Sequence, residues 1–480
     1  MCRGATLIVS LIGCAVGAGP DKPPPVEPGF HAEVPVGQAT RLDWTFAAAA
    51  VGAEPMNSAD AYDSTRQRCQ LFVPAAYDAS KAWPLVLFLS SGDDPRGWSA
   101  WQKTCENQAV IFCAPYGAGD NVAPAQRVRI LLDALDDVRR RCHVDADQTY
   151  LAGFGGGGRI ACAAAFALPE FFGGVVVAGE GTPLNGLEYL RWRARDRLSV
   201  ALIAAGKDHP LSPYFGDMEV RCKTWAEAKV GADGPPAETL AEAYAWMAAD
   251  LDRRRAEARA HPQLAAPDEA YTNVQAATLA VDAAKAELAR TDGVYRAATL
   301  LEGVDARWGR TQPADAARAL LTELRADAPR RKKWEDERDA EERRTLAAQA
   351  HLAERLGDLY GAIRNWGALA AAHGATPEGK KALEEVKRLT TTLATTPYLG
   401  LTVDDELVVR TVAPGGPAAA AGLKVGDRLT KLGATTPATT DDLRTAMQGL
   451  KPGDVVQVDV VREGQGVVLS VKVGSAPAKE

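Results

Sequence analysis

Four short, continuous apolar runs place the strongest constraint on how the first half of this chain can fold. Trp83–Leu89 reads WPLVLFL, and Ala109–Cys113, Val175–Ala178 and Ser199–Ala205 are similar in character. Such runs are typical of strands buried on both faces of a sheet. Helical segments lie between them, and the one over 125–142 places apolar side chains on one face: Val128, Leu131, Leu132, Leu135 and Val138. This alternation predicts a mostly parallel sheet with helices on both faces.

The length and composition indicate several domains. The chain has 480 residues, enough for about three domains. The α/β alternation occupies 30–255, the segment 256–395 is rich in Ala, Glu, Arg and Leu without strand-like runs, and 396–476 is strand-rich. We therefore predict a multidomain fold: an α/β domain, an all-α region of helical hairpins and a small β-rich domain. The formal net charge of −7 argues against nucleic acid as a partner.

The first 18 residues are interpreted as a signal peptide. Arg3 precedes an apolar run that is too short to span a bilayer core of ~30 Å. The residues LIGC at 11–14 resemble a bacterial lipobox, which implies cleavage before Cys14 and lipidation of its sulfur. An ordinary signal peptide cleaved within 17–19 is the alternative. Either reading exports the protein to the periplasm or cell envelope, and a Pro-rich tether over 19–29 follows.

The cysteines are concentrated in the α/β region. Besides Cys2 and Cys14, the chain has Cys69, Cys105, Cys113, Cys142, Cys162 and Cys222. In an oxidising compartment an even set predicts disulfides, although the sequence does not choose their connectivity. No pair has C-x-x-C spacing, so we expect no zinc site, and we expect no cofactor.

The segment 151–166, LAGFGGGGRIACAAAF, combines a short strand, a glycine cluster and a small-residue helix. This is the layout of a nucleophile elbow, which presents a serine as G-x-S-x-G. Here the five positions are 153–157, and Gly155 occupies the serine position. The nucleophile of an elbow is held in a strained conformation that costs about 1–3 kcal/mol. Glycine relieves that strain because it has no Cβ, but it cannot form a covalent intermediate.

The region 66–255 resembles the secreted α/β-hydrolase esterases of the dienelactone-hydrolase and polyester-depolymerase type. The resemblance rests on the elbow and on three further segments: LFVPAAYD at 71–78, PLVLFLSSG at 84–92 and LIAAGKDHP at 202–210. It implies a catalytic serine, acid and histidine in that chain order.

Two of those three members are absent. The acid position is retained as Asp208, but the loop expected to carry the histidine, 230–239, contains none. His209 follows the acid directly, so it is badly placed to be oriented by it, and we interpret it as a loop histidine without a catalytic role. We therefore predict a pseudo-hydrolase, and we favour the absence of enzymatic activity.

Two alternatives keep chemistry or binding in this cleft. Ser90 and Ser91 follow a central strand, so a carboxyl-ester hydrolase with a non-standard active site is the rival hypothesis. The amide of Gly156 and the first turn of the following helix, which carries Arg159, form a candidate site for a carboxylate or phosphate. A turn retained only for packing is the simpler reading.

The helical region shows one recognisable hairpin. Residues 346–389 weakly resemble a tetratricopeptide hairpin, in which one helix ends near Gly357, a second follows and Pro377 opens a third. The mixed charges of 330–344 indicate a solvated helix face.

The segment 396–476 resembles a PDZ domain over its whole length. Residues 398–401, YLGL, stand where the family has its carboxylate-binding loop, and 414–429, PGGPAAAAGLKVGDRL, match its small-residue helix, glycine and strand. The resemblance implies peptide binding as an added strand. The implied site comprises the amides near Leu399, Gly400 and Leu401, the side chains of Leu401 and Val403, and Leu443 and Met447 on the helix over 441–449. That Leu443 and Met447 are ordinary core residues is the alternative.

Taken together, these features predict a non-catalytic envelope protein that binds peptides or C-termini through a PDZ domain. The degenerate hydrolase domain would serve as a binding or scaffold module, and the membrane would be reached only through a lipid anchor. A protease accessory protein is a further alternative, although neither H-E-x-x-H nor G-x-S-x-G occurs in the chain.

Overall fold

The computed structural model describes residues 23–42, 62–184, 188–206, 208–227, 234–257, 273–404 and 406–476. The chain divides into two compact units, Met1–Arg338 and Asp339–Glu480. None of the helices within the described ranges is both long enough and apolar enough to cross a membrane. The predicted signal peptide and Cys14 lie outside the described residues.

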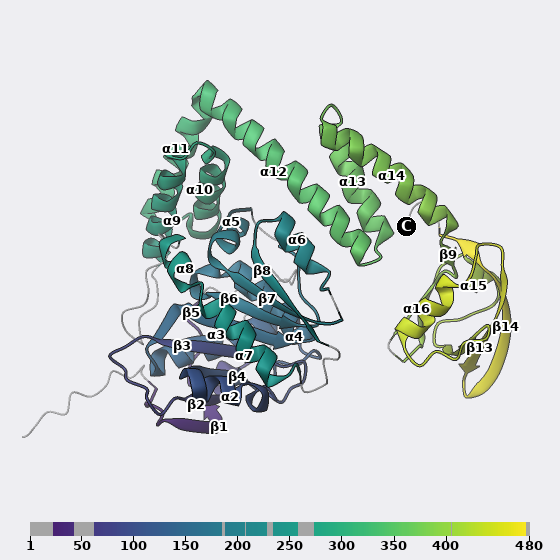
Figure 1. The fold of residues 1–480 in the computed structure, drawn as a ribbon, viewed down its shortest axis with the longest axis horizontal. Helices are drawn as coiled ribbons and strands as arrows, with labels where there is room; N and C mark the ends of the chain where they lie inside the picture. Colours follow the sequence, from purple (N-terminus) through teal and green to yellow (C-terminus); the bar gives the residue numbers. More distant parts are fainter. Residues whose placement is uncertain are drawn as a thin grey trace, which may run out of the picture. The chain divides into compact units, whose positions relative to one another are not determined.

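The first unit is built on an eight-stranded, mostly parallel sheet (Figure 1). The strand order is β1-β2-β4-β3-β5-β6-β7-β8. β2 runs antiparallel to both of its neighbours, and the other neighbouring pairs are parallel. The strands are β1 (Gly29–Pro35), β2 (Arg68–Val73), β3 (Trp83–Leu89), β4 (Ile111–Pro115), β5 (Val144–Phe154), β6 (Gly174–Ala178), β7 (Ser199–Ala205) and β8 (Arg221–Glu227).

Helices cover this sheet, which explains why its central strands lack polar alternation. Trp101 of α2 (Trp98–Gln108) and Met247 of α7 (Ala237–Ala248) join one apolar cluster with sheet residues such as Phe88. α3 (Pro124–Arg141) and α4 (Gly156–Ala167) contact each other and cover the opposite face. The remaining elements are α5 (Glu188–Arg197), α6 (Leu211–Asp217), α8 (Leu251–Glu257) and 3-10 turns at Ser64–Arg66 and Pro169–Phe171. The predicted α/β architecture is thereby confirmed.

Part of the helical region belongs to this first unit. α9 (Asn273–Leu288), α10 (Val294–Trp308) and α11 (Gln312–Ala326) share an apolar core. α10 packs against α5, and Arg307 forms a buried ion pair with Glu170 at 2.9 Å. α12 (Ala328–Arg355) crosses the division between the units, and most of its charged first half is exposed, as predicted.

The second unit contains the predicted hairpin and the β-rich domain. α13 (Leu359–His373) begins after Asp358, whose side chain accepts a hydrogen bond from the Gly361 amide, and α14 (Pro377–Thr395) begins at its proline. The β-rich domain has two helices, α15 (Pro417–Ala420) and α16 (Thr440–Gln448). Its strands are β9 (Pro397–Tyr398), β10 (Leu401–Val403), β11 (Val409–Val412), β12 (Arg428–Leu432), β13 (Val455–Arg462), β14 (Gln465–Lys472) and β15 (Gly474–Ser475).

The cysteines correct one prediction from the sequence. All six in the described part of the chain are free, and five of them are buried. Cys69 and Cys113 lie on neighbouring strands, and their thiols interact without forming a disulfide. Burial raises the pKa of the Cys142 thiol to about 11 and that of Cys162 to about 11. These cysteines act as small apolar side chains in the core.

Candidate functional site

The elbow is present in the structure and keeps the backbone shape of a nucleophile turn. β5 ends at Phe154, α4 begins at Gly156, and Gly155 between them has φ 54° and ψ −130°. This conformation is strained for any residue with a Cβ. A Cβ on Gly155 would nevertheless have room, because its nearest neighbour would be the Ser91 Cβ at 3.6 Å. The turn therefore has room for a Cβ at the predicted serine position.

The loop after β3 faces the elbow. The carbonyl oxygen of Ser91 accepts a hydrogen bond from the Asp120 amide at 2.8 Å, and that of Ser90 accepts one from Arg127 Nη2 at 3.2 Å. Arg127 Nη1 also donates to Asp120 Oδ1 at 2.7 Å. The guanidinium of Arg127 is almost completely buried, whereas the Asp120 carboxylate is half exposed. Sequence reasoning missed both residues, because neither belongs to a triad position nor to a recognisable motif.

The retained acid and its neighbouring histidine do not form a dyad. Asp208 is exposed, while His209 is buried. His209 Nε2 donates to the Gly179 carbonyl at 2.8 Å, and its Nδ1 accepts from the Leu211 amide at 3.2 Å. Burial lowers the pKa of His209. Because both ring nitrogens bond to the backbone, this imidazole holds the loop in place and has no free nitrogen for a substrate.

The loop expected to supply the catalytic histidine instead presents a glycine at the elbow. Residues 228–233 lie outside the described residues, but Gly234 packs on the ring of Phe154. A Cβ on Gly234 would lie 2.0 Å from that ring. The close approach brings this loop beside the nucleophile position without any basic side chain at its contact point.

Two carboxylates, those of Glu180 and Asp120, lie next to the groups of the predicted anion site. Arg159 in the first turn of α4 is half exposed and lies 3.9 Å from Glu180. Among the described residues, none accepts a hydrogen bond from the amides of Gly156 or Gly157. The Asp120 carboxylate lies against Gly156, where an added Cβ would meet Oδ1 at 2.2 Å.

A second candidate site lies in the β-rich domain, at the loop between β9 and β10. Gly400 adopts φ 78°, and the carbonyls of Leu399 and Gly400 accept hydrogen bonds from the amides of Ala418 and Ala413, each at 2.7 Å. No described residue accepts a hydrogen bond from the amides of Leu399 or Gly400. Two adjacent free amides suit a carboxylate.

The predicted groove residues all belong to one apolar cluster. Leu399 and Leu443 are buried in its core, whereas Leu401, Val403 and Met447 are half-buried at its edge. The structure thus brings β10 and α16 together at one apolar surface. Leu443 behaves as a core residue, and Met447 is the helix residue that remains accessible.

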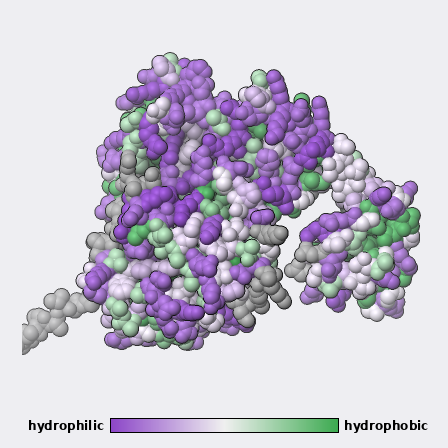
Figure 2. Space-filling view, viewed as in Figure 1, coloured by the Kyte–Doolittle hydropathy of each residue, from purple (hydrophilic) through white to green (hydrophobic). Residues whose placement is uncertain are grey.

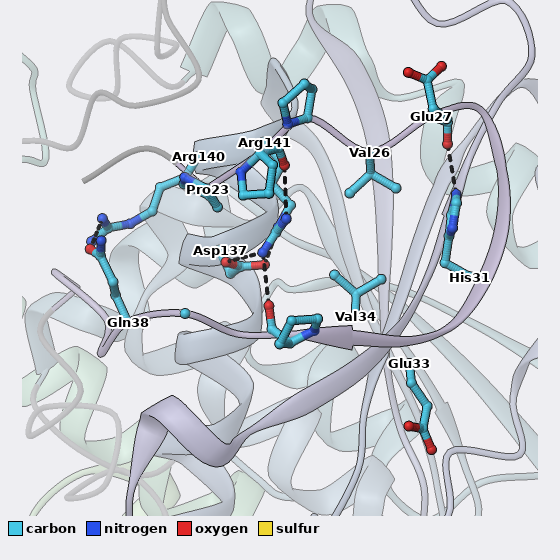
Figure 3. Close-up of a pocket in the computed structure, with 14 residues that line it drawn as sticks. Pro23, Val26, Glu27, His31, Glu33, Val34, Gln38, Asp137, Arg140 and Arg141 are labelled. Carbon is cyan, nitrogen blue, oxygen red and sulfur yellow. Dashed lines mark hydrogen bonds and ion pairs between the residues drawn. The ribbon is translucent and has the colours of Figure 1, made fainter. Parts of the chain in front are cut away.

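A cavity of about 550 Å³ in the first unit is lined by the Pro-rich segment and by none of the residues named for either site (Figure 3). Arg141 at the end of α3 donates to the carbonyls of Pro24 and Pro35, at 2.9 and 2.8 Å, and to the Asp137 carboxylate. The walls of the cavity include Val26 and Val34. The described part of the predicted tether is therefore docked on the domain, a feature that proline content alone did not reveal.

The family of the C-terminal domain follows from its sequence profile. The PDZ domain profile matches residues 392–473. The C-terminal domain is a PDZ domain. Two curated relatives match in this region: the serine protease Do-like HtrA of Lactococcus lactis subsp. cremoris, 34% identical over 92 residues, and the probable periplasmic serine endoprotease DegP-like of Ectopseudomonas mendocina, 39% identical over 70 residues.

These matches reach only a small part of the relatives. The first covers 19% of this chain and 23% of the relative, and the second covers 15% of each. Among solved structures, the HtrA-type protease AlgW with decapeptide is 27% identical, with 20% of this chain and 35% of that chain covered and a TM-score of 0.17. The likeness therefore concerns the PDZ domain, and the activity of the whole proteases does not transfer with it.

The α/β domain has esterases among its structural neighbours. Est1E from Butyrivibrio proteoclasticus is 14% identical, with 40% of this chain and 96% of that chain covered and a TM-score of 0.31. At that score the comparison carries no argument about activity. The strand order and the elbow geometry, described above, are the features that bear on function.

Proposed function

We propose that this chain is a non-catalytic binding protein of the bacterial cell envelope. Its PDZ domain binds peptides or protein C-termini, and its α/β domain acts as a binding or scaffold module. A single observation carries the non-catalytic part: the elbow conformation is kept at Gly155 while the nucleophile side chain is missing. A serine hydrolase deprived of any triad member retains only what its oxyanion hole and binding site supply.

The absence of a usable base supports this proposal. Acyl transfer needs a group that accepts the proton of the attacking hydroxyl within hydrogen-bond reach. His209 is the histidine nearest to the acid position in the sequence, and both of its nitrogens are engaged by backbone groups. The contact of Gly234 with Phe154 leaves glycine where the histidine loop approaches the elbow.

The peptide-binding part rests on the loop between β9 and β10. Free amides at Leu399 and Gly400 would bind a terminal carboxylate, and the exposed side of β10 would pair with the peptide backbone. The half-buried Met447 and Leu401 would receive an apolar side chain next to that carboxylate.

The location in the envelope rests on the sequence and on the relatives. The N-terminal segment predicts export, with Cys14 as the lipidation site, and one of the PDZ relatives is described as periplasmic. Labelling with radioactive palmitate in a bacterial host, with Cys14→Ser as the control, tests the lipid anchor. Equal labelling of the variant would exclude lipidation at this cysteine.

An ester-substrate assay on the full chain tests the absence of catalysis. We expect p-nitrophenyl acetate hydrolysis at the rate of the buffer and no labelling by a fluorophosphonate probe. Covalent labelling of any serine in the chain would overturn the non-catalytic proposal.

A carboxyl-ester hydrolase with a relocated nucleophile is the second candidate function. It is favoured by the position of Ser91, whose Cβ faces the empty nucleophile position at 3.6 Å. If turnover is found and Ser91→Ala abolishes it while Ser90→Ala does not, this alternative replaces the first.

A library of random C-terminal peptides tests the PDZ proposal. Selection should favour an apolar last residue, and amidation of the peptide terminus should weaken binding because it removes the carboxylate. Selection without preference at the last position, or binding unaffected by amidation, would contradict the proposed mode.

A further inference from the structure

The strand β14 of the PDZ domain has one edge that no other strand covers. The sheet order is β12-β13-β14, so β14 pairs with β13 on one side only. Within the described part of the chain, no group outside β13 forms a hydrogen bond with residues 465–472. α15 lies near the carboxyl end of the strand, where an added Cβ on Gly474 would meet Pro417 at 2.9 Å. The outer side of β14, at the margin of the domain in Figure 1, therefore presents free N–H and C=O groups.

The apolar core of the domain is also open along this edge. On the inner face of the sheet, Val467 of β14 stands opposite Val460 of β13, and Leu469 is paired with Val458 in the same way. The two β13 residues are buried, at 1% and 0% exposure, whereas both β14 residues are only half-buried. On the outer face, Val468 is 58% exposed. A further strand beside β14 would cover these side chains, and burial of apolar surface favours its addition.

The two edges of the α/β sheet are protected against such pairing, whereas β14 is not. β1 ends at Pro35, and its register with β2 is interrupted between His31 and Val34. Three of the seven residues of β8 are charged. Bulges, proline and charged side chains are the usual means of blocking an edge strand. β14 has eight residues in regular register with β13, and its one charged residue is Lys472 at the end.

We propose that β14 pairs antiparallel with β14 of a second copy of this chain, with Val468 at the two-fold axis. A two-fold contact requires a surface that is complementary to itself. In this register Val467 of each copy stands opposite Leu469 of the other, so apolar side chains meet on the inner face and extend the core. Lys472 stands opposite Gly464, so no like charges face each other. Parallel pairing in register would instead place the two Lys472 side chains together.

The strands of this chain favour a second β14 over its other edges as the partner. Pairing with β8 would set the apolar residues of β14 against charged side chains, and the bulge in β1 prevents a regular ladder. Antiparallel self-pairing meets neither obstacle. The contact also uses a different strand from β10, to which the peptide is assigned, so it does not depend on the proposed peptide binding.

A cysteine at the two-fold axis tests the register. Directly opposite residues of an antiparallel pair have Cα atoms about 4.5–5.5 Å apart, within the range for a disulfide. We expect the full chain with Val468→Cys to form a covalent dimer when it is oxidised with copper phenanthroline. The native chain controls for crosslinks through its own cysteines.

Ser470→Cys is the matched control for the crosslink, since Ser470 is exposed on the same face of the same strand. In the proposed register it stands opposite Gly466, about 13 Å from its own counterpart, so it should not crosslink. Equal crosslinking of the two variants, or none with Val468→Cys, would overturn the proposal.

Sedimentation equilibrium of the full chain measures the association itself. We expect the native chain to dimerise with a dissociation constant in the micromolar range, as small interfaces do. Val468→Lys should raise that constant about tenfold or more, because two like charges would face each other at the axis. Val425→Lys is the matched control: Val425 is 64% exposed and precedes β12, on the other side of the sheet, so the constant should not change.

A native chain that stays monomeric at about 100 µM would overturn the proposal. So would an equal loss of association in both lysine variants, or a dimer that Val468→Lys leaves intact. Circular dichroism checks that the variants are folded. Peptide affinity of Val468→Lys, measured alongside, should equal that of the native chain, so this inference and the proposed function fail separately.

Discussion

Gly234 packs so closely on Phe154 that a Cβ on the glycine would lie 2.0 Å from the aromatic ring. Phe154 immediately precedes Gly155, the predicted serine position, so the loop predicted to carry the histidine approaches the elbow here through a glycine. The predicted serine position and the loop predicted to carry the histidine therefore meet at Phe154.

The first prediction concerns Gly155→Ser. The variant regains a hydroxyl, but no base is placed to activate it, so we expect no hydrolysis of p-nitrophenyl acetate above the native chain. A residue with a Cβ must then adopt φ 54° and ψ −130°, which is strained, so the free energy of unfolding should fall by about 1–3 kcal/mol. Urea unfolding of Gly155→Ala provides the control and should show a similar loss. Turnover by the serine variant alone would reveal a base that the described residues do not supply.

The second prediction concerns the pH dependence carried by His209. Burial lowers its pKa in the folded state below that of the unfolded chain. Its contribution to stability is therefore complete above the unfolded pKa of about 6.5 and declines as the pH falls below it. Replacement by glutamine removes this titration. Urea unfolding between pH 7.5 and 5 should show a steeper loss of stability for the native chain than for His209→Gln, and parallel curves would contradict a buried neutral imidazole.

The third prediction concerns Arg141 and the Pro-rich segment. Arg141→Met removes the hydrogen bonds to the carbonyls of Pro24 and Pro35. It also removes the guanidinium that forms an ion pair with the buried Asp137 carboxylate. We expect a loss of about 3 kcal/mol in the free energy of unfolding. Limited proteolysis should also cleave within 23–28 faster than in the native chain.

The matched control for that experiment is the double variant with Asp137→Asn, which removes the uncompensated charge as well. It should recover part of the lost stability while the segment stays open to proteolysis, because the two carbonyls still lack their donor. If the protease resistance of the segment is unchanged in both variants, the docking through Arg141 is refuted.

The fourth prediction separates binding from packing in the PDZ domain. Leu443 is buried, so Leu443→Arg should unfold the domain, whereas Met447 is half-buried and Met447→Arg should leave it folded. We expect Met447→Arg to weaken binding of a peptide with an apolar terminus by about tenfold or more, the effect of losing one buried apolar contact. Fluorescence anisotropy measures the affinity, and circular dichroism checks the fold.

The control for this prediction is Val468→Arg. Val468 on β14 is 58% exposed, and Figure 2 shows apolar surface on this domain. This substitution should leave peptide affinity unchanged. A loss equal to that of Met447→Arg would place the binding surface elsewhere on the domain.

Much of the architecture was predictable from the sequence because it depends on local patterns. The strands Trp83–Leu89 and Ser199–Ala205 were predicted with the bounds that the structure shows. A short, uninterrupted apolar run is typical of a strand whose two faces are both covered by helices. The last helix of the hairpin region begins at Pro377, as predicted, because proline at the first helical position already has the backbone angle of a helix.

The disulfide prediction was wrong because the number of cysteines does not show which of them come close together. Pairing requires two sulfurs at bonding distance, and that depends on which strands and helices become neighbours. Cys69 and Cys113 are brought together by the β2–β4 pairing, yet both remain thiols within the apolar core.

The sequence by itself determined that glycine stands at the predicted serine position and that the last domain is a PDZ domain, because the identity of a residue and a loop motif can be read without the fold. Only the tertiary structure decided what surrounds the empty position. Asp120, Arg127 and Gly234 come from three separate segments, and their placement at the elbow follows from how the sheet orders its strands and stacks its helices, which no local pattern encodes.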